Sequence, residues 1–232
     1  MFSCLLCHGP CSARADFCPA CFADLPWNRH CCPRCAEPLA AHNHPQTCQN
    51  CSLMEPHFDH CQIPLRYEFP VNELLLAAKN AKPDLLKPLT RCLTGHIKDR
   101  AAPLPDLLVP VPLHPIKQRK RGFNQSGLVA QRLSKALSVP VSQNLIIKIR
   151  DIAQQKHLSR LERQHNLKRS FRVNLNEARK LRGKAPRVAL VDDIVTTGST
   201  VNQLAKQLIR AGFENIDVWA IARTPARTPS RQ

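Results

Sequence analysis

The sequence predicts an α/β protein: a parallel sheet with helices on both of its faces, preceded by a small cysteine-rich module. After residue 62, short apolar segments alternate with helical segments of about ten to fifteen residues, a pattern typical of a parallel sheet. Before it, four C-x-x-C pairs crowd into the first 51 residues. A chain of 232 residues that is 43% hydrophobic can bury a core of this kind.

The paired cysteines have the spacing of zinc ligands. A C-x-x-C turn points two thiolates at one tetrahedral ion, and two such turns complete a closed structural site. Ten residues separate the first two pairs, and twelve separate the last two. We expect two zinc ions with the pairs taken in order along the chain; the spacing leaves a crossed arrangement open. The expected ligands are Cys4, Cys7, Cys18, Cys21, Cys32, Cys35, Cys48 and Cys51.

Composition and pattern divide the chain into three predicted parts. These are a zinc-ribbon module over 1–61, an α/β domain over 62–222 and a disordered basic tail over 223–232, which has no acidic residue and no apolar run. Apolar segments predict strands, at 62–68, 107–111, 145–149, 188–191 and 215–222. Leucine spacing and prolines near first turns predict helices, at 70–80, 83–97 and 124–137.

The positive charge of the chain lies outside the cysteine module. Of 34 Lys and Arg and 17 Asp and Glu, residues 1–61 hold three basic and five acidic side chains. The rest of the chain therefore has 31 basic and 12 acidic residues, a net charge of +19, with the basic residues densest at 147–187. This field indicates a polyanionic partner, either nucleic acid or a phosphorylated small molecule, or both.

The sequence also predicts the compartment. No apolar stretch reaches the roughly 18 to 20 residues of a membrane-spanning helix. The first ten residues, MFSCLLCHGP, have neither a basic n-region nor a small-residue cleavage site. Paired cysteines in a chain without a secretion signal indicate metal rather than disulfides. We therefore expect a cytoplasmic protein.

The segment RVALVDDIVTTGSTVNQLAKQL, residues 187–208, predicts a binding site. A buried strand at 188–191 leads to Asp192 and Asp193, and ligands bind beyond the carboxyl ends of parallel strands. The small residues that follow wrap backbone amides around an anion at a helix N-terminus, and Gly198 allows close approach. Paired carboxylates for hydroxyls and a loop for an anion suit a ribose 5-phosphate. The hydroxyl donors of the loop are Thr196, Thr197, Ser199 and Thr200.

This segment resembles the phosphoribosyl-diphosphate (PRPP) binding motif of type I phosphoribosyltransferases. The resemblance implies that Asp192 and Asp193 bind the ribose, that 196–200 bind the 5-phosphate, and that Mg²⁺ bridges the diphosphate and ribose oxygens. VPVPLHPIKQRKRGFNQSGLVAQRL and RDIAQQKHLSRLERQHNLKRSF, with the four C-x-x-C pairs, resemble the ComF/GntX family. That resemblance implies a phosphoribosyltransferase-like fold and a cytoplasmic role in DNA uptake during natural transformation.

A basic loop is expected after the strand at 107–111, where a diphosphate lies in this fold. Arg121, next to Gly122, can bring its guanidinium close to phosphate oxygens, whereas a solvated loop stays the alternative for Lys117 and Arg119. Transfer would displace Mg-bound diphosphate at the anomeric carbon, with the protein supplying electrostatics and positioning. The expected catalytic residues are Asp192, Asp193 and Arg121.

The sequence names no acceptor and leaves open whether transfer is catalysed. One alternative is a non-catalytic protein that binds single-stranded DNA and uses the pocket to sense a ligand. Another is an adaptor whose cysteine module docks a helicase or DNA-uptake protein. Aromatic residues make up only 5% of the chain, so any DNA contact is expected to be directed at phosphates rather than stacked bases.

Overall fold

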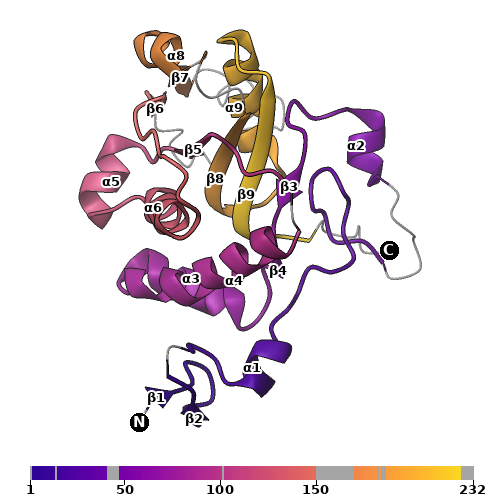
Figure 1. Ribbon diagram of the computed structural model, residues 1–232, viewed down its shortest axis with the longest axis vertical. Coiled ribbons are helices and arrows are strands. Elements are labelled where there is room, and N and C mark those ends of the chain that lie inside the picture. The colour runs from indigo at the N-terminus through magenta and orange to yellow at the C-terminus, as the bar shows by residue number, and fades with distance from the viewer. Residues whose placement is uncertain are drawn as a thin grey trace, which may run out of the picture.

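The computed structural model describes residues 2–13, 15–40, 47–100, 102–149, 170–181, 183 and 187–225. Its centre is a parallel sheet in the order β3-β9-β8-β5, with β4 also paired to β9 (Figure 1). The strands are β3 (Cys61–Gln62), β4 (Leu65–Arg66), β5 (Leu107–Pro110), β8 (Arg187–Val195) and β9 (Asn215–Arg223). The predicted parallel sheet is confirmed.

Helices cover both faces of this sheet, as predicted. Successive residues of a strand point to opposite faces, so Val188 and Leu190 enter one core cluster while Ala189 and Val191 enter the other. Among the described residues, three helices contribute buried side chains to the second of these faces and two to the first. They are α3 (Val71–Asn80), α4 (Leu86–Asp99) and α6 (Gln125–Leu137) on the second, and α8 (Leu175–Leu181) and α9 (Ser199–Arg210) on the first.

Several predicted elements have different ends in the structure. The strand expected at 62–68 is two short strands separated at Pro64, which has no amide hydrogen to donate to the ladder. The helix expected at 83–97 begins as a 3₁₀ turn, Pro83–Leu85, before α4. β8 continues to Val195 rather than stopping at 191, because β9 pairs with it that far.

Some elements were not predicted. The basic loop expected after β5 is instead a helix, α5 (Pro115–Arg121). The strand expected at 145–149 is β6 (Ile146–Lys148), and it pairs antiparallel with β7 (Phe171–Val173) outside the main sheet. At the other end of the chain, β9 includes Arg223, the first residue of the predicted tail, whereas 226–232 of that tail lie outside the described residues.

The cysteine segments contribute to the same two cores. β1 (Phe2–Ser3), β2 (Pro10–Cys11) and α1 (Pro19–Ala23) lie below α3 and α4, whereas α2 (Gln49–Leu53) lies on the β3 side of the sheet (Figure 1). Cys4 and Phe17 are buried in the cluster of α3 and α4. Cys32 and Cys35 are buried in the cluster of α9. The division into domains at residue 61 stays a prediction.

A membrane-spanning helix is not found in the part of the chain that the structure describes. None of its helices combines the length and the apolarity that a crossing requires.

Candidate functional site

Asp192 and Asp193 lie on β8 beyond the end of β5. The last residue pair of the two strands is Pro110 with Val191, and the amide of Val111 still donates to the carbonyl of Val191 (2.8 Å). No described strand pairs with this edge of β8 from Asp192 onward, while the other edge stays on β9. The carboxylates therefore lie at the carboxyl edge of the sheet, as expected, although within a strand rather than after it.

The carboxyl group of Asp192 holds its proton more tightly than an ordinary aspartic acid does. Asp192 Oδ1 accepts hydrogen bonds from Ser126 Oγ (2.8 Å) and from the amide of Asp193 (2.9 Å). Burial and the nearby charge of Asp193 raise the pKa of Asp192 well above its usual range, against the opposing effect of the Ser126 hydrogen bond. A ligand hydroxyl or a cation placed between the carboxylates would favour their ionised forms.

The loop after β8 leads directly into α9. Gly198 has a φ of 75°, in the left-handed region that favours glycine, and the space around its Cα is open. Thr197 Oγ1 lies 2.8 Å from Ser199 Oγ, and both side chains are exposed. The N-cap residue, Gly198, has no side chain to cap α9, and the amide of Ser199 donates to Thr197 Oγ1 (3.3 Å). The helix therefore presents amide donors and the positive end of its dipole beside hydroxyl groups, an arrangement suited to an anion.

The first turn of α6 lies between Asp192 and Arg121. Ser126 donates to Asp192, and the preceding Gln125 accepts from Arg121 Nη1 (2.7 Å) on its Oε1. Gln125 is only 4% exposed, and its Nε2 has no hydrogen-bond partner among the described residues. An unsatisfied buried donor costs about 1–3 kcal/mol. A ligand oxygen at this point would satisfy it.

The basic residues expected in a loop lie on α5. His114 caps this helix by accepting an amide of the first turn on Nδ1 (3.3 Å), and Gly122 ends it with a φ of 85°. Arg121 is half-buried beside α6, whereas Arg119 and Lys120 are exposed. Arg121 donates to Gln125, whose neighbour in the chain, Ser126, donates to Asp192.

Sequence reasoning missed Gln125 and Ser126. Both stand in the quoted RGFNQS segment, but only its arginine was singled out. Of the second family segment, RDIAQQKHLSRLERQHNLKRSF, residues 150–169 fall outside the described residues, and Ser170 and Phe171 lie within them.

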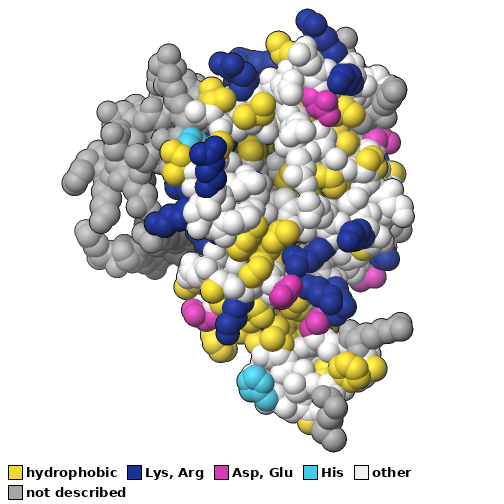
Figure 2. Space-filling view, turned by 90° about the vertical axis from the view of Figure 1, so that its left-hand side faces the viewer, with side chains coloured by type: hydrophobic (Ala, Val, Ile, Leu, Met, Phe, Trp, Pro, Cys, Tyr) yellow, Lys and Arg dark blue, Asp and Glu magenta, His cyan; other side chains and the backbone are white. Residues whose placement is uncertain are grey.

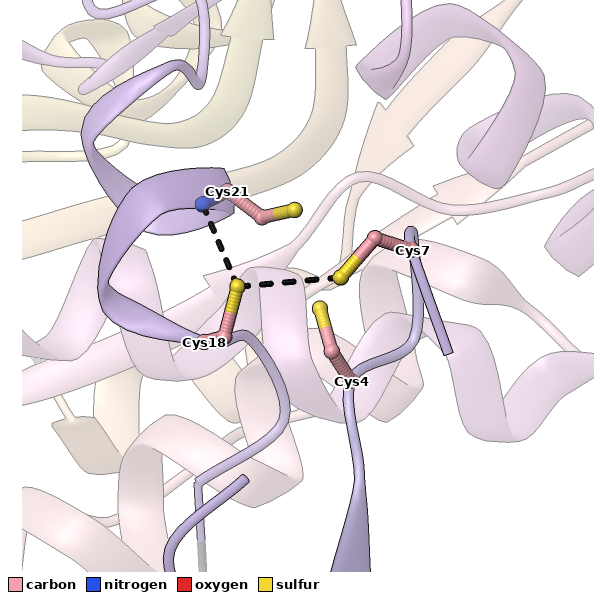
Figure 3. Close-up of side chains that lie close together, drawn as sticks. All are labelled: Cys4, Cys7, Cys18 and Cys21. Atoms are coloured by element: carbon pink, nitrogen blue, oxygen red, sulfur yellow. Dashed lines mark hydrogen bonds between the residues drawn. The ribbon is translucent and has the colours of Figure 1, made fainter. Parts of the chain in front are cut away.

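The eight paired cysteines form two groups of four, taken in order along the chain. Within each group all sulfur atoms lie within 4.8 Å of one another, and Figure 3 shows the first four converging. Cys7 Sγ lies 3.8 Å from Cys18 Sγ, and Cys35 Sγ lies 3.5 Å from Cys48 Sγ. Tetrahedral zinc with Zn–S bonds of about 2.3 Å holds its sulfurs about 3.8 Å apart. The donor sets fit structural zinc in the sequential arrangement.

The first C-x-x-C turn of each group, Cys4–Cys7 and Cys32–Cys35, is here called a knuckle, and the two knuckles repeat one backbone pattern. In each, the carbonyl of the first cysteine accepts the amide four residues later, at 3.0 Å and 2.9 Å. The amide of that cysteine donates to the carbonyl five residues later, at 2.9 Å and 2.8 Å. His8 and Ala36, which follow the second cysteines, both have positive φ values, 59° and 54°. The same left-handed turn at equivalent positions fits a shared function, the convergence of four sulfurs on one ion.

The protonation of the thiols also fits a dication. Burial opposes ionisation of Cys4, but amide donors from Cys7 and Cys18 lower its pKa to about 6. Burial and the charge of Cys35 raise the pKa of Cys51. Clustered thiolates repel one another, and a bound metal ion removes that repulsion by its own charge.

We expect Asp192→Asn to make the ligand-free protein more stable at neutral pH. A raised carboxyl pKa in the folded state means that the unfolded state loses this proton first, so stability falls as pH rises from about 4 through the raised pKa. Asparagine can still accept from Ser126 but does not ionise. Thermal melts from pH 5 to 8 should give a higher Tm for the variant than for wild type. Each kcal/mol gained in the free energy of unfolding raises Tm by about 2–4 °C, and the difference in Tm between the two proteins should grow with pH. A difference that shrinks with pH would contradict this.

Comparison with known proteins gives long matches. Residues 2–52 match the double zinc ribbon domain family. The chain is 33% identical over 230 residues to competence protein F of Haemophilus influenzae, covering 96% of this chain and 97% of that protein. It is 32% identical over 227 residues to the DNA utilization protein YhgH of Escherichia coli strain K12, covering 95% of this chain and 96% of that protein.

Solved structures give weaker matches. An allosteric regulatory enzyme of purine biosynthesis has a TM-score of 0.36 and 20% identity, over 57% of this chain and 25% of that chain. A purine phosphoribosyltransferase from Pyrococcus horikoshii has a TM-score of 0.33 and 13% identity, over 63% of this chain and 92% of that chain.

Proposed function

Since the chain belongs to the family of competence protein F and the YhgH DNA utilization proteins, we propose that it binds PRPP with Mg²⁺ and acts in DNA uptake or utilization. The names of these relatives, competence protein and DNA utilization protein, supply the process. One observation carries the ligand class: β8 bears the carboxylates of Asp192 and Asp193 and ends at Val195, and the turn Thr196–Gly198 then leads directly into the N-terminus of α9 at Ser199.

Each part of the site takes one part of the ligand. The ribose hydroxyls donate to Asp192 and Asp193, and Ser126 holds the first of these carboxylates by its 2.8 Å hydrogen bond. The 5-phosphate sits above Gly198, on the amides and hydroxyls at the start of α9. The open space at Gly198 leaves room for its oxygens. This division places the negative charges of ligand and protein at opposite ends of the loop.

The diphosphate lies toward α5 and α6. Arg121 supplies a guanidinium, and the unpartnered Nε2 of Gln125 supplies a neutral donor. When bound, Mg²⁺ neutralises part of the diphosphate charge and is held mainly through ligand oxygens and water, the usual manner of this ion with phosphates. The carboxylate pair lies on the ribose side, so its charge complements the cation.

Such a site supports pentosyl transfer to an acceptor. The bond from the anomeric carbon to diphosphate breaks, and a bond to the acceptor forms on the opposite face of the sugar. Asp192 and Asp193 stabilise the positive charge that develops on the sugar, and Arg121 stabilises the departing diphosphate. Binding of PRPP is the first step of this reaction, and it is the step that the experiment below tests.

Calorimetry of the full chain with PRPP and Mg²⁺ tests the proposal. We expect saturable binding at one site per chain, and binding at least about tenfold weaker for ribose 5-phosphate, because it lacks the groups that contact Arg121 and Gln125. Inorganic sulfate at equal ionic strength is the control for general anion binding. Absence of binding by PRPP up to about 1 mM would contradict the proposal, since that concentration corresponds to only about 4 kcal/mol of affinity.

Single-stranded DNA binding is a second candidate function, favoured by the +19 charge outside residues 1–61. In Figure 2, Lys and Arg side chains are spread over the side of the molecule that bears α5. Counterion release makes such binding fall steeply with salt. The same calorimetry with an oligothymidylate, at two salt concentrations, tests this function, and binding that is insensitive to salt would count against it.

A further inference from the structure

Arg223, the last residue of β9, makes contacts in two directions from a buried position. Its side chain is only 4% exposed, and it forms an ion pair with Glu37, whose side chain is 8% exposed. Its Nε donates to the carbonyl of Cys35 (3.1 Å), and its Nη1 donates to the carbonyl of Val195 (3.2 Å). One guanidinium therefore joins the cysteine segment to the end of β8.

The first direction leads to the second zinc group. Cys35 is one of its four ligands, with Sγ 3.5 Å from that of Cys48. Glu37 closes the same knuckle, since its carbonyl accepts the amide of Cys32 (2.8 Å). Segments of this kind take their shape from the metal. Arg223 is thus attached to backbone whose geometry zinc determines.

The second direction leads to the proposed phosphate loop. Val195 is the residue before TTGST, and its carbonyl accepts both from Arg223 and from the amide of Thr224 (3.0 Å). Two donors fix the orientation of this carbonyl. Because the peptide group is planar and trans, the amide of Thr196 must point the opposite way. Arg223 therefore helps to orient the first peptide of the loop.

We infer that Arg223 is a positioning residue through which the second zinc site, and not the first, holds the phosphate loop in its binding geometry. The inference rests on the ligand site proposed above. A buried ion pair is a poor source of stability, because apolar residues of similar size often serve equally well. Here the guanidinium also makes directed contacts with four partners at once: Glu37 and the carbonyls of Cys35, Val195 and Thr224.

The first zinc group provides the contrast. Its buried residues pack with α3 and α4, on the opposite face of the sheet from α9. In the described part of the chain, no hydrogen bond joins its cysteines to residues 195–200. An ion pair between Asp16 and Arg91 links this segment to α4. That pair has the same chemistry as Arg223 with Glu37 but a different place in the fold.

The test compares two double variants of the full chain. In Glu37→Met/Arg223→Met we expect two zinc ions per chain and a Tm somewhat below that of wild type, because both buried charges are removed together but the hydrogen bonds to the carbonyls of Cys35 and Val195 are lost. Ribose 5-phosphate should bind about tenfold more weakly, whereas Mg²⁺ with inorganic diphosphate, which contacts α5 and α6, should bind as in wild type. Asp16→Asn/Arg91→Met, the matched control, should bind both ligands normally.

The outcomes separate the inference from the function on which it rests. If wild type binds neither PRPP with Mg²⁺ nor ribose 5-phosphate, the proposed function is wrong; if it binds PRPP alone, PRPP replaces ribose 5-phosphate in the comparison. If wild type binds and the folded double variant binds equally well, or loses both ligands to the same degree, the positioning inference is wrong. If the double variant does not fold, Arg223→Lys is tested in its place, because lysine keeps the positive charge but not the planar guanidinium. Weaker binding of ribose 5-phosphate alone would then support the inference. Unchanged binding of ribose 5-phosphate would overturn it.

Discussion

Replacing Cys32 and Cys35 by serine will remove one zinc ion per chain and most of the stability of the protein. Both residues are buried in the core cluster that also contains residues of α9 and β9. Structural zinc contributes about 10–16 kcal/mol to the folding of small zinc-finger peptides. The whole stability of a domain is about 5–15 kcal/mol. The free energy of folding that is lost with the zinc ion is therefore larger than the remaining contacts of this segment can supply.

The measurements are zinc per chain by elemental analysis and the thermal unfolding curve. Cys31→Ser is the matched control, because Cys31 adjoins Cys32 but lies outside the group of four. We expect this control to keep two zinc ions and a Tm near that of wild type. A Cys32→Ser/Cys35→Ser protein with two zinc ions and an unchanged Tm would show that the second group is not a structural metal site.

Replacing Asp192 and Asp193 by asparagine together will reduce PRPP binding by about 100-fold or more. Hydrogen bonds to charged groups contribute about 1.5–3 kcal/mol each, and the proposal places the ribose hydroxyls on these two carboxylates. Removal of both charges also weakens the attraction of the site for Mg²⁺. Because Asp192→Asn is expected to stabilise the fold, the loss of binding cannot be attributed to unfolding.

Asp217→Asn is the matched control for this loss. Asp217 lies on the neighbouring strand β9, opposite Ala189, and burial raises the pKa of its carboxyl too. It stands three register positions before Ala220, which pairs with Asp192, and so lies away from the carboxyl edge of the sheet. Calorimetry should give wild-type affinity for this variant. A double Asp192→Asn/Asp193→Asn protein that binds PRPP within about threefold of wild type would overturn the assigned site.

The parts of the molecule that the sequence predicted are those specified locally. A C-x-x-C pair fixes two sulfurs within one turn, so the two groups of four could be anticipated from spacing. The strand, loop and helix around Gly198 are also contiguous, and the turn needs glycine at that position. The helix α5 was locally specified as well, by Pro115 at its start and Gly122 at its end. Its run of basic residues led to the expectation of a loop.

The parts that could not be predicted depend on residues far apart in the chain. The hydrogen bond from Ser126 to Asp192 exists because the first turn of α6 packs over β8, which no local pattern encodes. The end of β8 at Val195 is set by its partner β9. From the sequence, Arg223 was predicted to be the first residue of a basic tail, because its ion-pair partner Glu37 lies far away in the cysteine module.

The sharing of cores between the cysteine segments and the sheet has a consequence for assembly during translation. The knuckle at Cys32 and Cys35 packs with Val218 and Ala220 of β9, which the ribosome adds nearly two hundred residues later. Until then, this core cluster lacks the residues of β9, and a metal ion acquired early keeps the knuckle compact. Cells starved of zinc should therefore accumulate this chain as aggregate from the moment of synthesis, rather than as a folded protein that merely lacks its metal.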